Sequence, residues 1–498
     1  MGDHFLCCLR STFATHSSRP ALVYGERTLC YGELDARAEN FAALLQGQGI
    51  RPGDRVVLYT ADKLPFLIAH LGVLYAGGVC VPLNPRFTRE EMRYFLADSG
   101  ARVAVIGEEQ RPVVESLRPE LPELLAVIPD TAVLEAPRCS VSQCDPSGDA
   151  PCLMIYSSGT TGWPKGVVHT QGNMASALFA LQACWRFSLD DRVVNVLPLF
   201  HVHGLYFATH LSLLTGACVA IEKSFHPLES LQAIGRGTVF MGVPTIYYRL
   251  LQQPEFRQAA RSWSRLRLAT CGSAPIRAEV LPDLEAILGR PVINRYGMSE
   301  AHVITSLPLD GPWPHGSVGT PLQGVEVRVV VEDGQTAVPG AVGSVVLRGP
   351  NLFREYWNKP EATRAAFAGG CFDTGDLGYF NADGFLTLVG RKSDLIITNG
   401  FNVYPQVVER VINECLGVRE CAVLGLPDDR RGERVIAVIV RDDAALDENR
   451  LRAHWSERLV DYQRPVTVLF VDALPRNAMG KVLRRELREQ ILGIVNRP

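Results

Sequence analysis

A short segment dense in hydroxyl and glycine residues is the strongest chemical signal in the sequence. The segment 156–166 reads Tyr-Ser-Ser-Gly-Thr-Thr-Gly-Trp-Pro-Lys-Gly and directly follows an apolar run of strand length. Backbone N–H groups and hydroxyls in such a loop can surround a polyphosphate, to which Lys165 adds a positive charge. The glycine spacing differs from that of a P-loop NTPase, and the plain alternative is a polar turn. The predicted phosphate-binding residues are Ser157, Ser158, Gly159, Thr160, Thr161, Gly162 and Lys165.

Five further segments extend this signal along the chain. Together with the loop they resemble, in order and spacing, the acyl-adenylate-forming superfamily of acyl-CoA synthetases, adenylation domains and beetle luciferases. The resemblance spans nearly the whole chain, and six motifs in register are far more specific than any one of them. The further segments are 272–275 (Gly-Ser-Ala-Pro), 295–300 (Arg-Tyr-Gly-Met-Ser-Glu), 374–376 (Thr-Gly-Asp), 390–391 (Gly-Arg) and 475–481 (Pro-Arg-Asn-Ala-Met-Gly-Lys).

The resemblance implies an ATP site in which each side chain has a physical role. Asp376 offers two acceptor oxygens to a ribose 2′,3′-diol, and Arg391 can donate to the same sugar. Tyr296 presents a flat face to adenine. The plainer alternatives are a turn residue for Asp376 and a core residue for Tyr296. The nucleotide-binding residues that the resemblance implies are Gly272, Ser273, Ala274, Pro275, Tyr296, Gly297, Met298, Ser299, Asp376 and Arg391.

The catalytic residues that the resemblance implies are Lys481, His201, Glu300 and Thr160. Glu300 is similar to the family's Mg²⁺ ligand, and one carboxylate suits a hard dication that also binds phosphate. Lys481 would contact both the acyl oxygen and the α-phosphate and neutralise charge as pyrophosphate departs. His201 resembles a gate that closes the acyl site, whereas the nearby His203 could be an ordinary core histidine.

Two further segments bear on the second half-reaction. The segment 398–405 resembles the loop that lines a thioester-forming tunnel, so Asn399, Gly400 and Phe401 are the predicted acceptor-loop residues. Ser393 stands where the family's interdomain hinge usually has Asp or Lys. A small residue there does not forbid rotation, although it leaves the balance between the two orientations open.

The acyl substrate is the least defined part of the prediction. Within the superfamily, the segments 200–205, 241–249, 294–298 and 305–306 look most like malonyl-CoA synthetases. Arginines of that group hold the distal carboxylate of a small diacid, and guanidinium suits such a partner. Alternatively, Arg249 lies on an exposed helix face and Arg295 pairs with an internal acid. The predicted substrate-binding residues are His201, Arg249, Arg295 and Gly272.

Four functions compete at this stage. The first is an acid–CoA ligase that uses ATP, Mg²⁺ and CoA. The second passes the adenylate to an amine or amino acid, and the third loads a carrier protein in another chain. The fourth is a binding protein without catalysis, against which intact Lys481, Glu300 and Asp376 argue. A luciferase-type oxygenase would require a specialised pocket. CoA is the preferred acceptor because a thiolate is a strong nucleophile.

The elements that must position these residues follow from the hydrophobic pattern. Apolar residues at three- and four-residue spacing over 33–48 predict a helix that ends at Gly49, and the apolar runs 55–60 and 102–106 predict strands. Helices between apolar strands predict a mostly parallel sheet. The predicted fold is α/β: an N-terminal domain (1–392) of two doubly wound α/β subdomains (about 1–150 and 151–309) and a β-barrel-like subdomain (310–392), followed by a mobile α+β domain (393–498).

Composition limits the classes of partner. A chain of 498 residues is longer than a single hydrophobic core normally supports, so several domains are expected. Its 50 Lys and Arg against 53 Asp and Glu give a net charge of −3, which does not indicate a basic surface for binding nucleic acid. Thirteen scattered cysteines and an N-terminus without a long apolar run predict a cytoplasmic protein. The uncharged stretches 64–83 and 193–221 contain repeated Pro, Gly and His, so no membrane span is predicted.

Overall fold

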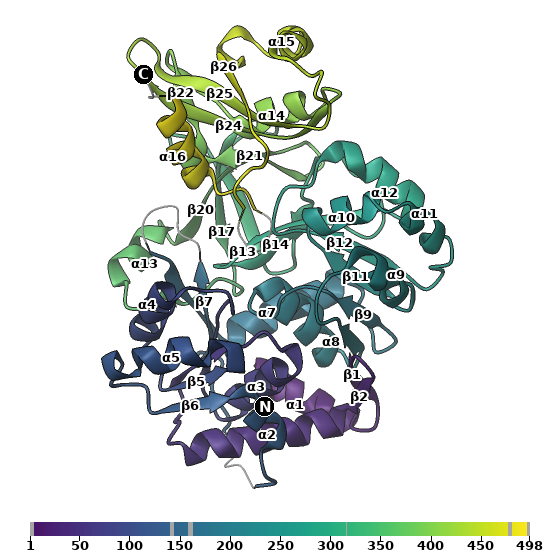
Figure 1. Cartoon of the computed structure of the whole chain (residues 1–498), viewed down its shortest axis with the longest axis vertical. Coiled ribbons are helices and arrows are strands. Elements are labelled where there is room, and N and C mark those ends of the chain that lie inside the picture. The colour runs from purple at the N-terminus through teal and green to yellow at the C-terminus, as the bar shows by residue number, and fades with distance from the viewer. Residues whose placement is uncertain (1–3, 140–143, 158–162, 315, 477–480, 496–498) are drawn as a thin grey trace.

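Four β-sheets and their covering helices make up the part of the chain that the structure describes. The structure is a computed structural model, and it describes residues 4–139, 144–157, 163–314, 316–476 and 481–495 (Figure 1). Two large sheets form the N-terminal part of the molecule, and a sheet with its own helices forms the C-terminal part at the opposite end (Figure 1). None of the helices in these ranges is long and apolar enough to cross a bilayer.

The first sheet is mostly parallel, as the sequence predicts. Its strands follow the order β18-β8-β7-β4-β3-β5-β6, and only the β18–β8 and β8–β7 pairs are antiparallel among those described. The helices α3 (Lys63–Tyr75) and α4 (Arg89–Ser99) connect its parallel strands. The strands are β3 (Arg55–Tyr59), β4 (Val79–Pro82), β5 (Val103–Ile106), β6 (Ala126–Pro129), β7 (Pro151–Ser157), β8 (Lys165–Thr170) and β18 (Glu355–Tyr356).

The second sheet has a parallel centre and antiparallel edges. Its order is β15-β14-β13-β12-β11-β9-β10-β1-β2, with β1 parallel to β10 and β2 antiparallel to β1. Its strands are β1 (Pro20–Tyr24), β2 (Arg27–Cys30), β9 (Arg192–Asn195), β10 (Cys218–Ile221), β11 (Val239–Gly242), β12 (Leu268–Cys271), β13 (Val292–Met298), β14 (His302–Ser306) and β15 (Thr320–Pro321).

Strand pairing crosses the subdomain boundary expected near residue 150. The strands β1 and β2 belong to the second sheet, because Leu22 pairs with Val219. Conversely, β7 and β8 belong to the first sheet, because Leu153 pairs with Cys80. Residue 150 therefore does not separate the strands of the two α/β sheets, because each sheet contains strands from both sides of that point. A hydrophobic run predicts a strand but not its neighbour in the sheet.

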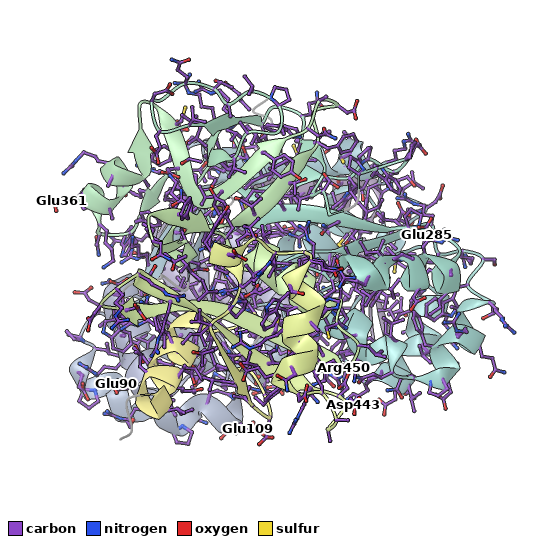
Figure 2. All side chains as sticks on the ribbon, turned by 90° about the horizontal axis from the view of Figure 1, so that it is seen from above. Glu90, Glu109, Glu285, Glu361, Asp443 and Arg450 are labelled. Atoms are coloured by element: carbon purple, nitrogen blue, oxygen red, sulfur yellow. The ribbon has the colours of Figure 1, made fainter. Side chains whose placement is uncertain are left out.

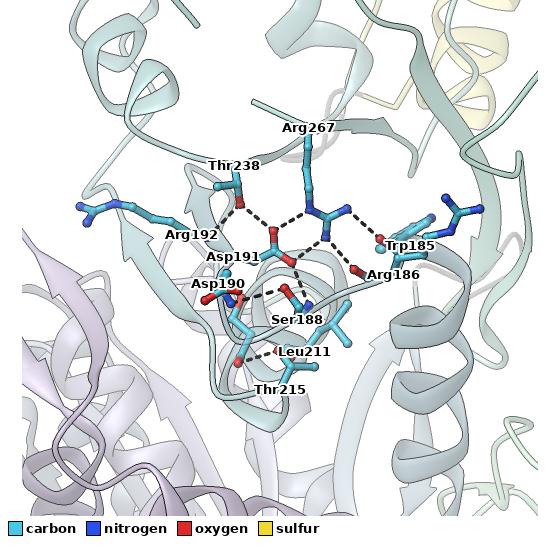
Figure 3. A network of polar contacts seen from close by, with 11 residues as sticks. Trp185, Arg186, Ser188, Asp190, Asp191, Arg192, Leu211, Thr215, Thr238 and Arg267 are labelled. Atoms are coloured by element: carbon cyan, nitrogen blue, oxygen red, sulfur yellow. Dashed lines mark hydrogen bonds and ion pairs between the residues drawn. The ribbon is translucent and has the colours of Figure 1, made fainter. Parts of the chain in front are cut away.

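A buried ion pair fixes the amino edge of the second sheet. Arg267, just before β12, donates to both carboxylate oxygens of Asp191, at 2.7 and 2.6 Å (Figure 3). Thr238 donates to Asp191 at 2.7 Å, and Arg267 also donates to the backbone oxygen of Trp185 at 3.0 Å. Burial raises the pKa of Asp191, but the hydrogen bonds from Arg267, Ser188 and Thr238 outweigh it and hold this pKa below its ordinary value. The network joins the starts of three strands to the end of one helix.

The third sheet is antiparallel, and its strand order is open. The order β16-β17-β20-β19, with β21 pairing β20, includes no pair that would close a barrel within the described residues. Within the described residues, the part expected to be barrel-like is thus an open antiparallel sheet. Its strands are β16 (Glu326–Val330), β17 (Gly343–Arg348), β19 (Phe367–Ala368), β20 (Cys371–Phe380) and β21 (Leu386–Arg391), and α13 (Pro360–Ala366) lies between β18 and β19.

The C-terminal sheet buries both of its faces. Alternate residues of β24 pack into two separate cores, with Val423 on one side and Ala422 and Leu424 on the other, as the two-residue period of a strand requires. The strands are β22 (Ile396–Thr398), β23 (Phe401–Val403), β24 (Val418–Asp428), β25 (Gly432–Arg441) and β26 (Thr467–Phe470), and the helices are α14 (Pro405–Asn413), α15 (Glu448–Ser456) and α16 (Arg484–Val495).

The remaining helices cover the two large sheets. The helix α2 (Tyr31–Gly47) begins at a capping box between Cys30 and Glu33 and has Gln48 as its C-cap, close to the predicted end. Surface charges such as Glu90, Glu285 and Glu361 project outward from different parts of the molecule (Figure 2). The others are α1 (Phe5–Thr15), α5 (Arg111–Leu117), α6 (Asp130–Glu135), α7 (Gln171–Trp185), α8 (Leu211–Leu214), α9 (Pro227–Gly235), α10 (Pro244–Leu251), α11 (Pro254–Ala260) and α12 (Leu281–Leu288); short helical turns occupy η1 (Glu108–Gln110), η2 (Arg118–Glu120), η3 (His203–His210), η4 (Ala278–Val280), η5 (Lys392–Asp394) and η6 (Asp461–Gln463).

Candidate active site

The predicted site residues of the second sheet meet at the carboxyl ends of its parallel strands. Gly272 follows β12 directly, Arg295 and Tyr296 lie in β13, and the segment after β9 leads to His201. The carboxyl ends of parallel strands share one edge of a sheet, which is where α/β proteins bind ligands. Segments that are far apart in the sequence thus come together, on the edge opposite the Asp191–Arg267 network.

A buried guanidinium that forms no ion pair with the described residues is the central feature of this edge. Arg295 is only 5% exposed, and its guanidinium carbon lies 5.0 Å from the ring centroid of Phe207. Within the described part of the chain, its Nε and Nη2 atoms have no hydrogen-bond partner. Burial lowers the pKa of Arg295 to about 10, yet the group stays cationic at neutral pH. A buried cation of this kind is costly unless an anion accompanies it.

His203 completes the buried cluster. Its Nδ1 lies 3.2 Å from the hydroxyl oxygen of Ser273, and its Nε2 has no partner among the described residues. Burial, followed by the charge of Arg295, lowers the pKa of His203 well below its ordinary value. The imidazole is therefore neutral, and one ring nitrogen remains available to a ligand.

Gly272 is required by the position of Arg295. A Cβ at Gly272 would lie 2.6 Å from both Cζ and Nε of Arg295, closer than real contacts allow. Only a residue without a side chain lets the guanidinium pass at this point. The sequence motif at 272–275 and the buried arginine are thus two parts of one arrangement.

The two arginines predicted to hold a distal carboxylate differ in burial. Arg249 lies on α10 with its side chain exposed, and its guanidinium carbon lies 5.0 Å from the ring centroid of Phe225. It lies outside the buried cluster, in agreement with the alternative that this residue occupies an exposed helix face. His201 is half-buried with its ring 4.6 Å from that of Phe200, and burial lowers its pKa to about 4. Of the two arginines, only Arg295 faces the cluster.

Asp376 is held by residues from two sheets. The hydroxyl of Tyr296 donates to Asp376 Oδ2 at 2.5 Å, and Arg391 Nε lies 3.0 Å from Asp376 Oδ1. The pairing of β20 with β21 places Asp376 directly opposite Arg391, and β13 supplies Tyr296. A Cβ at Gly297 would lie 2.1 Å from the backbone oxygen of His302, so glycine is needed there as well. Tyr296, Asp376 and Arg391 thus form one polar cluster.

Glu300 is a buried carboxylate beside a lysine. Tyr356 donates to Glu300 Oε1 at 3.1 Å, and Lys165 Nζ lies 4.7 Å from the ring centroid of Tyr356. Burial raises the pKa of Glu300, and Tyr356, Arg391 and Lys165 act in the opposite direction. In the ranges described, no group of three or more His, Cys, Asp or Glu could hold a metal by itself. A single buried carboxylate fits Mg²⁺ that arrives bound to phosphate oxygens.

The phosphate loop is described only at its two ends. Ser157 closes β7 and pairs with Lys165 at the start of β8. The predicted residues Ser158, Gly159, Thr160, Thr161 and Gly162 lie outside the described residues. The other motif residues line the same edge: Ser273 and Pro275 are exposed, and Ala274, Met298 and Ser299 are partly buried.

Lys481 comes to this edge from the C-terminal sheet. Burial and the charge of Arg391 lower the pKa of Lys481, whereas Asp376 and Asp394 act in the opposite direction. The residue keeps contact with solvent. These influences place its ammonium group in the electrostatic range of the Asp376–Arg391 pair. The predicted catalytic lysine and the predicted ribose-binding residues therefore lie in one region.

The predicted acceptor loop borders a separate cavity of about 330 Å³ in the C-terminal part. Phe401 is 53% exposed and stacks on Tyr462 with ring centroids 4.6 Å apart. Asn399 and Gly400 both have positive φ angles, which form the tight turn between β22 and β23. The lining residues are Thr398, Asn399, Phe401, Arg431, Val435, Asp461, Tyr462, Arg464 and Val466. Ser393 lies in η5, where its hydroxyl donates to Asp394 at 3.1 Å.

Sequence reasoning missed several contributors to this site. Tyr356, which contacts Glu300, belongs to a two-residue strand without any motif, so no local signal marks it. Phe207 lies four residues after His203 in the π-helical segment η3, a spacing that would have paired them on one helix face. Arg431 and Arg464 join the cavity only through the fold of the C-terminal sheet.

Comparison with known proteins relates the chain to one family over most of its length. The AMP-binding enzyme family matches residues 9–357, and the AMP-binding enzyme C-terminal domain matches residues 407–481. A malonate–CoA ligase of Arabidopsis thaliana is 32% identical, over 90% of this chain and 81% of its own. A feruloyl-CoA synthase of Amycolatopsis is 34% identical over 97% of both. The ATP-bound structure of MatB from Rhodopseudomonas palustris is 35% identical, with a TM-score of 0.94 over 99% of this chain and 100% of that one.

Proposed function

Because this chain belongs to the AMP-binding enzyme family and is an AMP-forming acid–CoA ligase, we propose that it activates a small dicarboxylic acid, with malonate as the first candidate. The enzyme uses ATP with Mg²⁺ and takes CoA as its second substrate. The proposal concerns the identity of the acid and the roles of the individual residues.

The observation that supports a diacid is the buried guanidinium of Arg295, in which Nε and Nη2 have no hydrogen-bond partner among the described residues. One carboxylate of the substrate must react at the nucleotide, so it is not available to neutralise a buried cation. A second carboxylate would accept hydrogen bonds from Arg295 Nε and Nη2, the two atoms that have no partner within the described residues. The neutral His203 would donate through its open ring nitrogen, with Ser273 fixing the ring. A monocarboxylic acid would leave the cation alone.

In the first half-reaction, a carboxylate oxygen of the acid attacks the α-phosphorus of ATP and the bond to pyrophosphate breaks. Asp376 and Arg391 would hold the ribose, since their polar atoms are already fixed at 3.0 Å from each other. Glu300 would hold Mg²⁺, which supplies positive charge to the phosphates when bound. Lys481 would neutralise the charge that develops between the acyl oxygen and the α-phosphate.

In the second half-reaction, the thiol of CoA loses its proton, attacks the acyl carbon and displaces AMP. The cavity beside the acceptor loop is suited to the nucleotide end of CoA. Arg431 offers a cation to phosphates, as would Arg464 once released from its ion pair with Asp461 at 2.5 Å. The stacked rings of Phe401 and Tyr462 offer a flat apolar surface to adenine. These four residues form our proposed CoA subsite.

The test of the diacid compares malonate with a monocarboxylic acid of similar size in ATP–pyrophosphate exchange. Arg295→Ala should lower kcat/KM for malonate by about 10²–10⁴, because removing one member of a buried charge pair strands the other at a cost of about 3–5 kcal/mol. The monoacid should lose much less. Arg249→Ala is the matched control, and it should alter neither acid because its guanidinium is exposed.

Equal losses for both acids in Arg295→Ala would return this residue to a structural role. Absence of malonate turnover by the wild type would reject the diacid itself. Products identified by mass, with CoA offered in one set and amino acids in the other, test the acceptor. Accumulation of amides without thioesters would contradict CoA as the acceptor.

A further inference from the structure

A hydrogen bond joins the C-terminal sheet to the segment that follows the motif at 272–275. Arg277 Nη1 donates to the backbone oxygen of Arg419 at 2.9 Å. Arg277 lies two residues after Pro275, and Arg419 lies near the start of β24. The contact therefore links the nucleotide edge of the large N-terminal part to the part that carries Lys481.

The acceptor in this contact is set free by a β-bulge. Val418 pairs with Arg441 and Glu420 pairs with Val440, and the register shifts between these two pairs. Arg419 is thus the extra residue of the bulge and lacks a partner in the ladder. Because β24 is also the edge strand of its sheet, the carbonyl group of this residue is available to a donor from outside the sheet.

The donor is also held in place before it reaches the bulge. The backbone N–H of Arg277 donates to the hydroxyl of Tyr248 at 2.9 Å, and the guanidinium carbon lies 4.8 Å from the ring centroid of the same tyrosine. Stacking on Tyr248 limits the rotamers of Arg277, so the entropy lost on contact is reduced. The bulge docks against a preformed group.

Further contacts lead from the bulge to the catalytic lysine. Glu420, next to the bulged residue, forms an ion pair with Arg476. Arg476 in turn forms an isolated antiparallel bridge with Val482, the residue after Lys481. The side chain of Arg419 also donates to the backbone oxygen of Asp472 at 2.9 Å. The segment that carries Lys481 thus rests on the same bulge that Arg277 holds.

We infer that Arg277 is a positioning residue for Lys481 in adenylation. It contacts no reacting atom, and it acts by holding the bulge at 419–420, and through Arg476 the lysine segment, against the nucleotide edge. The inference rests on the ligase activity and on the role proposed for Lys481, but it does not depend on the diacid. It is therefore tested with whichever acid gives the fastest ATP–pyrophosphate exchange in the wild type.

The decisive experiment is a double-mutant cycle. Arg277→Ala should lower kcat for exchange about tenfold, the loss typical of a hydrogen bond from a charged donor, and Arg277→Lys should recover most of it. If Arg277 acts through Lys481, adding Arg277→Ala to Lys481→Ala should cause no further loss. Arg265→Ala, which removes an exposed arginine of the same domain, is the control and should match the wild type.

Two further measurements separate positioning from general damage. Supplied with preformed acyl-adenylate and CoA, Arg277→Ala should form thioester within about twofold of the wild-type rate, because that step does not use the charge of Lys481 on the departing pyrophosphate. Glu420→Gln, which weakens the next contact of the chain, should reduce exchange in the same direction. Unchanged exchange in Arg277→Ala, multiplied losses in the double variant, or parallel losses in both half-reactions would each overturn the inference.

Discussion

At the scale of single residues, the site depends on charges that have been taken out of water. The guanidinium of Arg295 lies against a glycine, an aromatic ring and a neutral histidine, none of which can balance its charge. Such an arrangement is unfavourable in isolation and becomes favourable when an anion binds. The buried cation therefore lowers the stability of this region in the absence of ligand and raises its affinity for an anion.

Gly272→Ala tests the packing at this point. The added methyl group would lie 2.6 Å from the guanidinium and must displace it, so kcat/KM for the preferred acid should fall about tenfold, as overpacking by about 1–3 kcal/mol allows. Steady-state kinetics with both acids measures the effect. Gly47→Ala, in open space on α2, is the control and should leave the kinetics unchanged. Normal kinetics in Gly272→Ala would show that the guanidinium has room elsewhere.

Lys481→Ala tests the charge that acts on the α-phosphate. The variant should lose about 10²–10³ in the rate of ATP–pyrophosphate exchange, the usual effect of removing one electrostatic contact to a transition state. Its thermal unfolding should match that of the wild type, because the residue keeps contact with solvent. An unchanged rate would assign the role to another lysine.

At the scale of elements, the two edges of the second sheet have different roles. The carboxyl edge carries the site, whereas the amino edge is fixed by the bidentate pair of Asp191 and Arg267 (Figure 3). The pair holds β12 against the end of α7 through the backbone oxygen of Trp185. Stability and chemistry are thus placed at opposite ends of the same strands.

Asp191→Ala should therefore lower stability without a specific effect on catalysis. Loss of the carboxylate leaves Arg267 half-buried and unpaired, at a cost of about 3 kcal/mol, which urea unfolding at neutral pH would measure. The folded-state pKa of Asp191 is lowered, so its stabilisation is present above the ordinary aspartate pKa and is lost as pH falls through the folded value. A fall in kcat at full folding would contradict this separation of duties.

Most elements were predictable from the sequence, but their partners were not. The runs at 55–60 and 102–106 became β3 and β5, and the helix at 33–48 became α2 within two residues. The resemblance likewise predicted roles for Asp376, Arg391 and Arg295, and the structure joins the first two in an ion pair. By contrast, the exposure of Arg249 and the bulge at Arg419 depend on tertiary packing and on a register shift. Local periodicity carries no information about either.

At the scale of the whole molecule, the interior of the large N-terminal part contains several neutral histidines. Burial lowers the pKa of His70 to about 3 and that of His169 to about 4, and it holds those of His210 and His302 well below the ordinary value. The rings of His70 and His210 lie 4.8 Å apart, and those of His169 and His302 lie 4.0 Å apart. None of these pairs can accept two charges without large cost.

Stability should therefore decline in acid. The unfolded chain binds protons at these histidines below about pH 6.5, whereas the folded chain does not, so the free energy of unfolding falls as pH drops from about 6.5 towards the folded pKa values. His169 alone accounts for a fall of about 3 kcal/mol in the free energy of unfolding between pH 6.5 and pH 4. Urea unfolding between pH 7.5 and pH 5 measures the slope of the free energy of unfolding against pH. His70→Gln should reduce this slope by the equivalent of up to one bound proton. A flat profile in the wild type would show that the interior accommodates the charge.

The return of β1 to a sheet built mainly from later residues has a consequence for biosynthesis. Residues 20–24 are synthesised about two hundred residues before their parallel partner β10. At about 5–20 residues per second, the first strand waits roughly 10–40 s for its neighbour. For that time β1 has at most the adjacent strand β2 as a partner, and its other edge stays unpaired, so this protein is expected to be a client of the chaperones that meet polypeptides at the exit tunnel.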